Sequence, residues 1–152
     1  MAAGKNQAPI YLDDLAVGDV FISASHELDA QQIIRFASEF DPQPFHIDEE
    51  AARDAFFQGL AASGWHTSAI TMKLLVGSFP LARGVIGAGG EISWPQATRP
   101  GDVLKVTSTI LEIIPSRSKP DRGLVVVQSI TANQHGEVRQ KLTSKVLCFR
   151  KD

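Results

Sequence analysis

The segment that most constrains the fold of this chain is ASGWHTSAITMKLLVGSF, residues 62–79. Its apolar residues do not keep to one side of a helix; they are Trp65, Ala69, Ile70, Met72, Leu74, Leu75, Val76 and Phe79. Lys73 is the one charged residue of the segment, and Pro80 ends the helix because proline cannot continue it. A helix that is apolar nearly all round belongs in the middle of a core. We therefore expect a central helix that is buried on every side.

The half of the chain before this segment predicts one strand and two helices. Residues 18–28 have the pattern of a strand. Residues 29–40 begin with a capping-box pattern at Asp29 and continue with apolar residues at helical spacing. We expect this helix to end at residue 40 or 41, because Pro42 disfavours the helical conformation in the residue before it. A second, short helix is expected over residues 49–57.

After the central helix the chain changes to the two-residue period of strands. Residues 85–94 read as a strand that carries several glycines, which permit bending or close contact between backbones. Residues 102–114, 123–134 and 137–150 alternate between two sets of side chains, as half-buried strands do. The order of one strand, then helices, then a run of about four strands predicts an α+β fold with an antiparallel sheet around the central helix.

The composition is that of a single soluble globular domain, residues 1–152. Hydrophobic residues make up 43% and charged residues 21% of the chain. Fifteen basic and seventeen acidic residues give a net charge of −2, which provides no electrostatic reason to expect a nucleic acid or an anionic membrane surface as a partner. Cys148, the single cysteine, excludes an intrachain disulfide and is expected to be a small buried residue.

Targeting signals are not evident in the sequence. The N-terminus lacks the uninterrupted apolar core of a secretory signal, and the longest apolar windows are interrupted, so no segment is expected to span a bilayer. A cytoplasmic location is the default expectation.

Asp41 and His46 are the residues with the clearest capacity for chemistry. Pro42 and Pro44 lie between them and restrict the backbone, so both side chains can be presented from one rigid turn. A carboxylate and an imidazole held together can act as an acid–base pair on a shared water. On residue types alone, a plain connector with a capping Asp41 and a partly buried His46 is the better explanation of the stretch.

A wider pattern favours the functional reading. The motif D-x-x-P-x-H-x-D at residues 41–48, followed by G-x-x-A-S-G at residues 59–64, resembles the MaoC-like dehydratases, which include the (R)-specific enoyl-CoA hydratases. Their usual form is D-x-N-P-x-H-x-D with a glycine eighteen residues after the histidine, and the same spacing separates His46 from Gly64. Two further stretches resemble the family in the same order, residues 11–21 and 92–113. The likeness therefore covers most of the chain.

This resemblance implies a fold, a reaction and an assembly. The fold is a hot dog, in which an antiparallel sheet wraps around one long apolar helix. The reaction is the reversible hydration of a trans-2-enoyl-CoA to an (R)-3-hydroxyacyl-CoA, in which Asp41 and His46 hold the catalytic water. Gly64 would supply a backbone N–H to the thioester carbonyl. An acyl-CoA substrate and a homodimer or higher homo-oligomer are implied, with no metal and no cofactor apart from the coenzyme A of the substrate.

Several residues depart from the family pattern. Gln43 stands where asparagine is common, and Ser63 replaces a frequent histidine; neither is expected to touch the Asp–His pair. The bulky Phe45 and Trp65, with Phe56 and Phe57 nearby, are expected to line the acyl pocket and either to shorten it or to favour an unusual acyl group. His66 is expected to be a hydrogen-bonded histidine near the start of the central helix.

Some alternatives remain open at this stage. The hot-dog fold also serves acyl-CoA thioesterases, and a non-catalytic acyl-CoA-binding protein is a third possibility. The sequence does not assign the base to either Asp41 or His46, and it does not choose between CoA and acyl carrier protein. It also gives neither the acyl chain length nor the working direction of the reaction.

Overall fold

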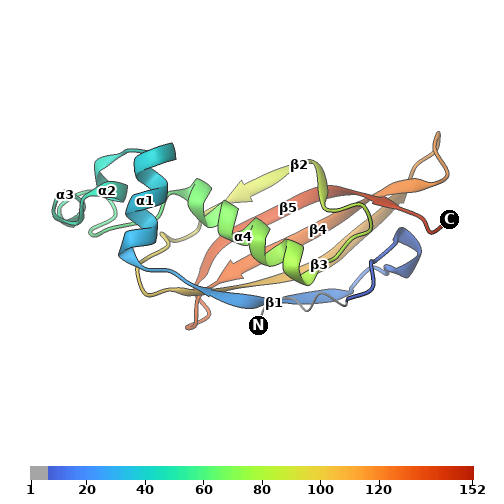
Figure 1. The fold of residues 1–152 in the computed structure, drawn as a ribbon, viewed down its shortest axis with the longest axis horizontal. Helices are drawn as coiled ribbons and strands as arrows, with labels where there is room; N and C mark the ends of the chain where they lie inside the picture. The colour runs from blue at the N-terminus through green and yellow to red at the C-terminus, as the bar shows by residue number, and fades with distance from the viewer. Residues whose placement is uncertain (1–6) are drawn as a thin grey trace.

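The computed structural model describes residues 7–152, which form a five-stranded antiparallel sheet with helices on one face and beyond one end (Figure 1). The order of the strands in the sheet is β1-β3-β4-β5-β2. The elements, in chain order, are η1 (Leu12–Asp14), β1 (Val20–Glu27), α1 (Ala30–Phe40), α2 (Pro44–Ile47), α3 (Glu49–Arg53), α4 (Gly64–Ser78), β2 (Ile86–Ser93), β3 (Val103–Pro115), β4 (Arg122–Ala132) and β5 (Val138–Phe149). The predicted α+β hot-dog architecture is confirmed.

The long helix α4 lies across the face of the sheet (Figure 1). Its sheet-facing side is buried and carries Ile70, Leu74 and Leu75. The opposite side is not buried: Trp65 is 61% exposed, and Met72 and Val76 are also exposed. The prediction of burial on every side is therefore wrong for the single chain, because the sheet covers only one side of the helix. The apolar residues on the other side remain without cover.

Strands β3 and β4 have the predicted two-residue period. In β4, alternate residues from Gly123 to Thr131 are buried, and β3 alternates in the same way from Leu104 to Ile110. Cys148 in β5 is 1% exposed and belongs to the main core cluster, so its predicted role as a small buried residue is confirmed. Burial raises the pKa of its thiol to about 11, which keeps the thiol protonated and unreactive near neutral pH.

Strand β2 forms one edge of the sheet and is exposed along its whole length. Its glycines have the two uses that the sequence suggested. A Cβ at Gly90 would lie 2.5 Å from the carbonyl oxygen of Thr143, so only glycine allows this close approach to β5. Gly89 has a φ of 136°, and the register with β5 shifts between Gly87 and Gly89. The strand is therefore bent where it meets its neighbour.

The helices α1, α2 and α3 gather beyond one end of the sheet (Figure 1). The side chain of Asp29 caps α1 as predicted, and the helix ends at Phe40. Helix α3 ends at Arg53, before the predicted residue 57, because the chain turns there and reaches a φ of 52° at Gln58. Helix α2 was not predicted; Pro44 occupies its first turn, where a missing N–H costs nothing.

Candidate active site

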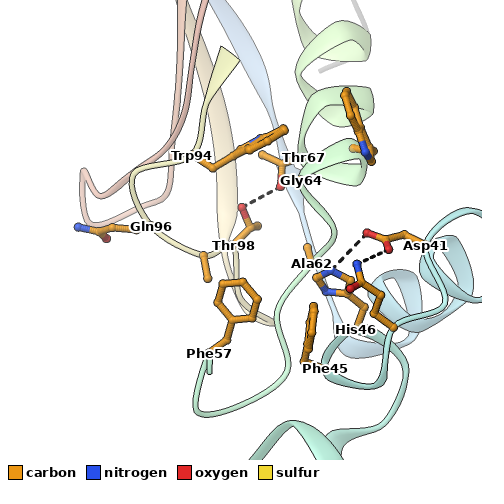
Figure 2. Close-up of a pocket in the computed structure, with 13 residues that line it drawn as sticks. Asp41, Phe45, His46, Phe57, Ala62, Gly64, Thr67, Trp94, Gln96 and Thr98 are labelled. Atoms are coloured by element: carbon orange, nitrogen blue, oxygen red, sulfur yellow. Dashed lines mark hydrogen bonds and ion pairs between the residues drawn. The ribbon is translucent and has the colours of Figure 1, made fainter. Parts of the chain in front are cut away.

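A pocket of about 310 Å³ opens where α2, the start of α4 and the segment after β2 meet (Figure 2). It is lined by Asp41, Gln43, Phe45, His46, Phe57, Ala62, Gly64, Trp65, Thr67, Trp94, Gln96, Ala97 and Thr98. All five site residues named from the sequence are among them. Folding thus brings together residues from the two motifs, with aromatic rings forming much of the wall.

Asp41 and His46 face each other across a short gap (Figure 2). Asp41 is the residue after α1, and His46 lies in α2. Asp41 Oδ2 is 3.3 Å from His46 Nε2, and the His46 residue is only 5% exposed. The two prolines of this stretch position both side chains from one short turn, as the sequence suggested.

The ring of His46 is held from its other side. Its Nδ1 lies 2.5 Å from the carbonyl oxygen of Ala61. A carbonyl oxygen can only accept a hydrogen bond, so Nδ1 must carry the hydrogen. In the neutral ring, Nε2 is then an acceptor that faces the carboxylate of Asp41. Two acceptors face each other at this place, an arrangement that a water molecule can satisfy by donating one hydrogen to each.

Asp41 is stabilised as a carboxylate. Gln43 Nε2 donates to Asp41 Oδ1 at 2.6 Å, and the side chain of Ser63 is near enough to favour the ionised form of the carboxyl group. Burial alone would raise the pKa of Asp41, but the side chains of Ser63 and Gln43 outweigh this effect and lower it. The expectation that Gln43 and Ser63 do not touch the pair is therefore wrong.

These two contacts could be found only partly from the sequence. Gln43 is two residues from Asp41, and a side chain that close can reach back to it. Ser63 is brought to Asp41 by the fold, and at the same time it caps α4 by accepting from the N–H of Trp65 at 3.3 Å. No local sequence pattern predicts a contact between Ser63 and Asp41, because the two residues are far apart in the chain.

Gly64 is the first residue of α4. Among residues 7–152, no acceptor bonds to its backbone N–H. That N–H lies at the helix N-terminus, where free donors and the helix dipole favour negative charge. A Cβ at Gly64 would also lie 2.7 Å from Cε2 of Trp94. Glycine therefore lets the indole ring pack directly against the helix start.

Trp94 is a part of the pocket that the sequence did not indicate. Its Nε1 donates to Gln140 Oε1 at 2.9 Å, and its ring meets that of Trp65 edge to face, with centroids 5.7 Å apart. Deeper in the pocket, the hydroxyls of Thr67 and Thr98 are bonded at 2.9 Å (Figure 2). The polar atoms of Trp94, Thr67 and Thr98 are thus bonded to other side chains, which leaves this part of the pocket wall mainly apolar.

His66 differs from its predicted state. It does not line the pocket, and its Nδ1 is buried without a hydrogen-bond partner among the described residues. Its ring stacks on Phe36 with centroids 4.4 Å apart. Burial, with smaller contributions from His26 and Arg35, lowers the pKa of His66 to about 4. The imidazole is therefore neutral near pH 7, and the expected hydrogen bond is wrong for Nδ1.

The described part of the chain has neither a cluster of metal ligands nor a membrane-spanning helix. Residues 7–152 contain no group of three or more His, Cys, Asp or Glu side chains placed to hold a metal ion. Within the same residues, no helix has the length and hydropathy needed to cross a membrane.

A sheet around one long helix, with an Asp–His pair facing the helix start, is the arrangement that the sequence motifs anticipated. The family model of the MaoC like domain matches residues 15–133. The chain therefore belongs to the MaoC-like dehydratase family, whose hydratases and dehydratases share this architecture.

Three similar proteins agree with this assignment, two through sequence identity and the third through its fold. The crystal structure of the MaoC-like dehydratase from Rhodospirillum rubrum is 62% identical, covers 94% of this chain and 99% of its own, and superposes with a TM-score of 0.92. The uncharacterized protein YdeM of Bacillus subtilis is 36% identical over 124 residues, which are 81% of this chain and 87% of YdeM. The R-hydratase PhaJ1 from Pseudomonas aeruginosa is 22% identical, with a TM-score of 0.75 over 94% of this chain and 88% of its own, and shows the fold.

Proposed function

We propose that the protein catalyses the reversible hydration of a trans-2-enoyl-CoA to an (R)-3-hydroxyacyl-CoA. The observation that carries this proposal is the pair of acceptors, Asp41 Oδ2 and His46 Nε2, 3.3 Å apart at the wall of a pocket. The unbonded N–H of Gly64 lines the same pocket. The R-hydratase function of PhaJ1, which has the same fold, agrees with this reaction.

Asp41 is the better candidate for the base. Its lowered pKa keeps it ionised near neutral pH, so it can take a proton from the bound water. His46 Nε2 accepts the other hydrogen of that water and orients its oxygen. The oxygen then adds to C3 of the enoyl group while one O–H bond breaks, and Asp41 receives the proton. Asp41 returns this proton to C2, so atoms and charges balance and both residues end in their starting states.

The thioester carbonyl gains negative charge as oxygen adds to C3. The N–H of Gly64, at the start of α4, is the donor proposed to stabilise this charge. Because the water and the returned proton both act from the side of Asp41, both groups add to the same face of the double bond. The (R) configuration at C3 requires that the matching face of the enoyl group meets Asp41. The reaction adds the elements of water across the double bond without net oxidation or reduction, so it calls for no redox cofactor. Phe45 and Trp65 line the pocket for the acyl group.

A panel of enoyl-CoAs tests the proposal. Hydration is followed by loss of the enoyl-thioester absorbance, and the configuration of the product is determined by chiral analysis. Asp41→Asn and His46→Ala are each expected to lower the rate by roughly 10²–10⁴-fold without loss of folding. Asp54→Asn and His135→Gln serve as controls, because both residues are exposed and lie outside the pocket. Wild-type turnover in both Asp41→Asn and His46→Ala would contradict the assignment.

The same assay separates the two alternative functions. Release of free CoA with no 3-hydroxyacyl product would identify an acyl-CoA thioesterase. Tight binding of enoyl-CoAs without turnover would identify a non-catalytic acyl-CoA-binding protein. Parallel substrates carried on acyl carrier protein decide between the two carriers.

A homodimer is also proposed. The edge strand β2 has one free side along its length, and the apolar face of α4 next to it is uncovered. Contact between Trp65 of α4 and Trp94 joins these two surfaces. A second copy of the chain, pairing at β2, would cover both. Light scattering coupled to size-exclusion chromatography gives the mass, and Ile92→Lys on β2 is expected to shift it to that of a monomer.

A further inference from the structure

The segment that holds His46 has no regular structure of its own. Residues 54–63 join α3 to α4, and Ala61 within this segment provides the carbonyl oxygen that bonds to His46 Nδ1. Gln58 and Gly59 both have positive φ values, so the path of the chain here is irregular. Two backbone bonds hold this place: the N–H of Ala61 donates to the carbonyl oxygen of Phe45 at 3.2 Å, and the N–H of Ala62 donates to that of Thr98 at 2.9 Å. The residues just before Ala61 need further support.

Arg99 provides much of that support. Its Nη1 donates to the carbonyl oxygens of Gly59 at 3.0 Å and Leu60 at 3.2 Å, and its Nη2 donates to that of Phe57. One guanidinium thus donates hydrogen bonds to three carbonyl oxygens, all of them within the four residues that precede Ala61. The planar guanidinium suits this task, since its donors point in several fixed directions at once.

Arg99 is itself held by a buried ion pair. Its backbone N–H donates to Asp102 Oδ2 at 2.8 Å, and the N–H of Asp102 donates back to the carbonyl oxygen of Arg99 at 3.1 Å. Arg139 contacts both oxygens of Asp102, with Nε 2.9 Å from Oδ2 and Nη2 3.2 Å from Oδ1. Burial would raise the pKa of Asp102, but the bond from Arg139, the N–H of Arg99 and Asn133 outweigh it and lower it. The turn that carries Arg99 is therefore fixed to the sheet.

We propose that Arg99 is a positioning residue that sets the tautomer of His46 by holding the carbonyl of Ala61 in place. This inference deepens the proposed hydration and rests on it. Arg99 does not line the pocket, so it acts on the reaction through the segment 57–61 and not on the substrate.

The tautomer of His46 decides whether Nε2, which faces Asp41, can accept a hydrogen bond. With hydrogen on Nδ1, the lone pair of Nε2 is free to accept from a water beside Asp41. If the carbonyl of Ala61 moved away, hydrogen could shift to Nε2, which would donate directly to Asp41 Oδ2, 3.3 Å away. The water would then lose one acceptor, and the carboxylate would be occupied by His46. Loss of this acceptor for the water should lower kcat. Because Phe57, whose carbonyl oxygen Arg99 holds, also lines the pocket, KM is expected to change as well.

Two kinds of measurement test this proposal on the intact protein. The ¹⁵N chemical shifts of His46, assigned by comparison with His46→Ala, report which ring nitrogen carries hydrogen. Wild type should show hydrogen on Nδ1, while Arg99→Ala and the milder Arg99→Lys should show a population with hydrogen on Nε2. With an enoyl-CoA that the wild type hydrates, kcat should fall by about 10²-fold. Arg53→Lys is the matched control, because Arg53 is exposed and no polar side-chain contact to it occurs among the described residues.

Chemical rescue separates a positioning role from a general loss of stability. Guanidinium at low millimolar concentration should restore both the kcat of Arg99→Ala and the Nδ1–H signal, whereas ethylammonium should not. The proposal is overturned if His46 keeps its hydrogen on Nδ1 in both Arg99 variants, whatever happens to kcat. Should the wild type hydrate no enoyl-CoA, the proposed function fails, and the NMR result still decides whether Arg99 controls the tautomer.

Discussion

The substitution Gly64→Ala tests how tightly the indole ring of Trp94 packs against the start of α4, where glycine has no Cβ. The new Cβ would lie 2.7 Å from Cε2, 2.8 Å from Cζ2 and 3.0 Å from Cδ2 of Trp94. Carbon atoms pack best at about 3.5–4.0 Å, so the indole ring would have to move by roughly 1 Å. That movement would stretch the 2.9 Å bond from Trp94 to Gln140. Overpacking of this kind costs about 1–3 kcal/mol in the free energy of unfolding.

Activity should respond as well as stability. Displacement of the helix start would move the Gly64 N–H away from the position proposed for the thioester carbonyl, and loss of one such donor costs about 10²–10³-fold in kcat. Urea denaturation measures the stability, and the enoyl-CoA assay measures kcat.

A double mutant separates the steric cause from other causes. Trp94→Leu gives room for the methyl group, so Gly64→Ala should be less destabilising in the Trp94→Leu background than in the wild type. Residues in contact show coupling energies of about 0.5–3 kcal/mol in such a cycle. If the two effects simply add, or if Gly64→Ala alone leaves stability unchanged, the steric reasoning is refuted.

Three further substitutions address the charged and titratable groups. Ser63→Ala removes a donor that lowers the pKa of Asp41, so that pKa should rise, and the fall of kcat/KM on the acid side should begin at higher pH. Arg139→Leu leaves the carboxylate of Asp102 buried without its partner, and urea denaturation at pH 7 should show a loss of about 3–5 kcal/mol. The lowered pKa of His66 means that the unfolded chain binds a proton there between about pH 6.5 and 4 while the folded chain does not, so stability falls as the pH drops through this range. His66→Phe should flatten that part of the curve, and an unchanged slope between pH 7 and 4.5 would contradict the assignment.

The elements of the fold were mostly predictable because they are encoded locally. The two-residue period marked β3, β4 and β5, and the capping pattern at Asp29 marked the start of α1. The exposed face of α4 was not predictable in this way. Apolar residues on every side of a helix indicate that each side is covered by something, but they do not indicate whether the same chain supplies the cover.

The site was predictable to the extent that it lies in short motifs. Asp41, His46 and Gly64 follow from spacing and family likeness, and the fold places them at one pocket. The supporting contacts were not predictable, because residues distant in the sequence make them. Arg99 reaches back about forty positions to its carbonyl partners, and nothing in the local sequence marks that contact.

The position of α1, α2 and α3 beyond the end of the sheet has a consequence for local unfolding (Figure 1). Helix α1 contacts α4 and α2, and α2 contacts α3, whereas the strands are joined by long ladders of hydrogen bonds. Segments with fewer buried contacts open at a lower free energy than the sheet. Amide hydrogens of α2 and α3 should therefore exchange with solvent before those of β4. Each such opening would separate His46 from Gly64, so the two halves of the pocket can part and close again while the sheet stays folded.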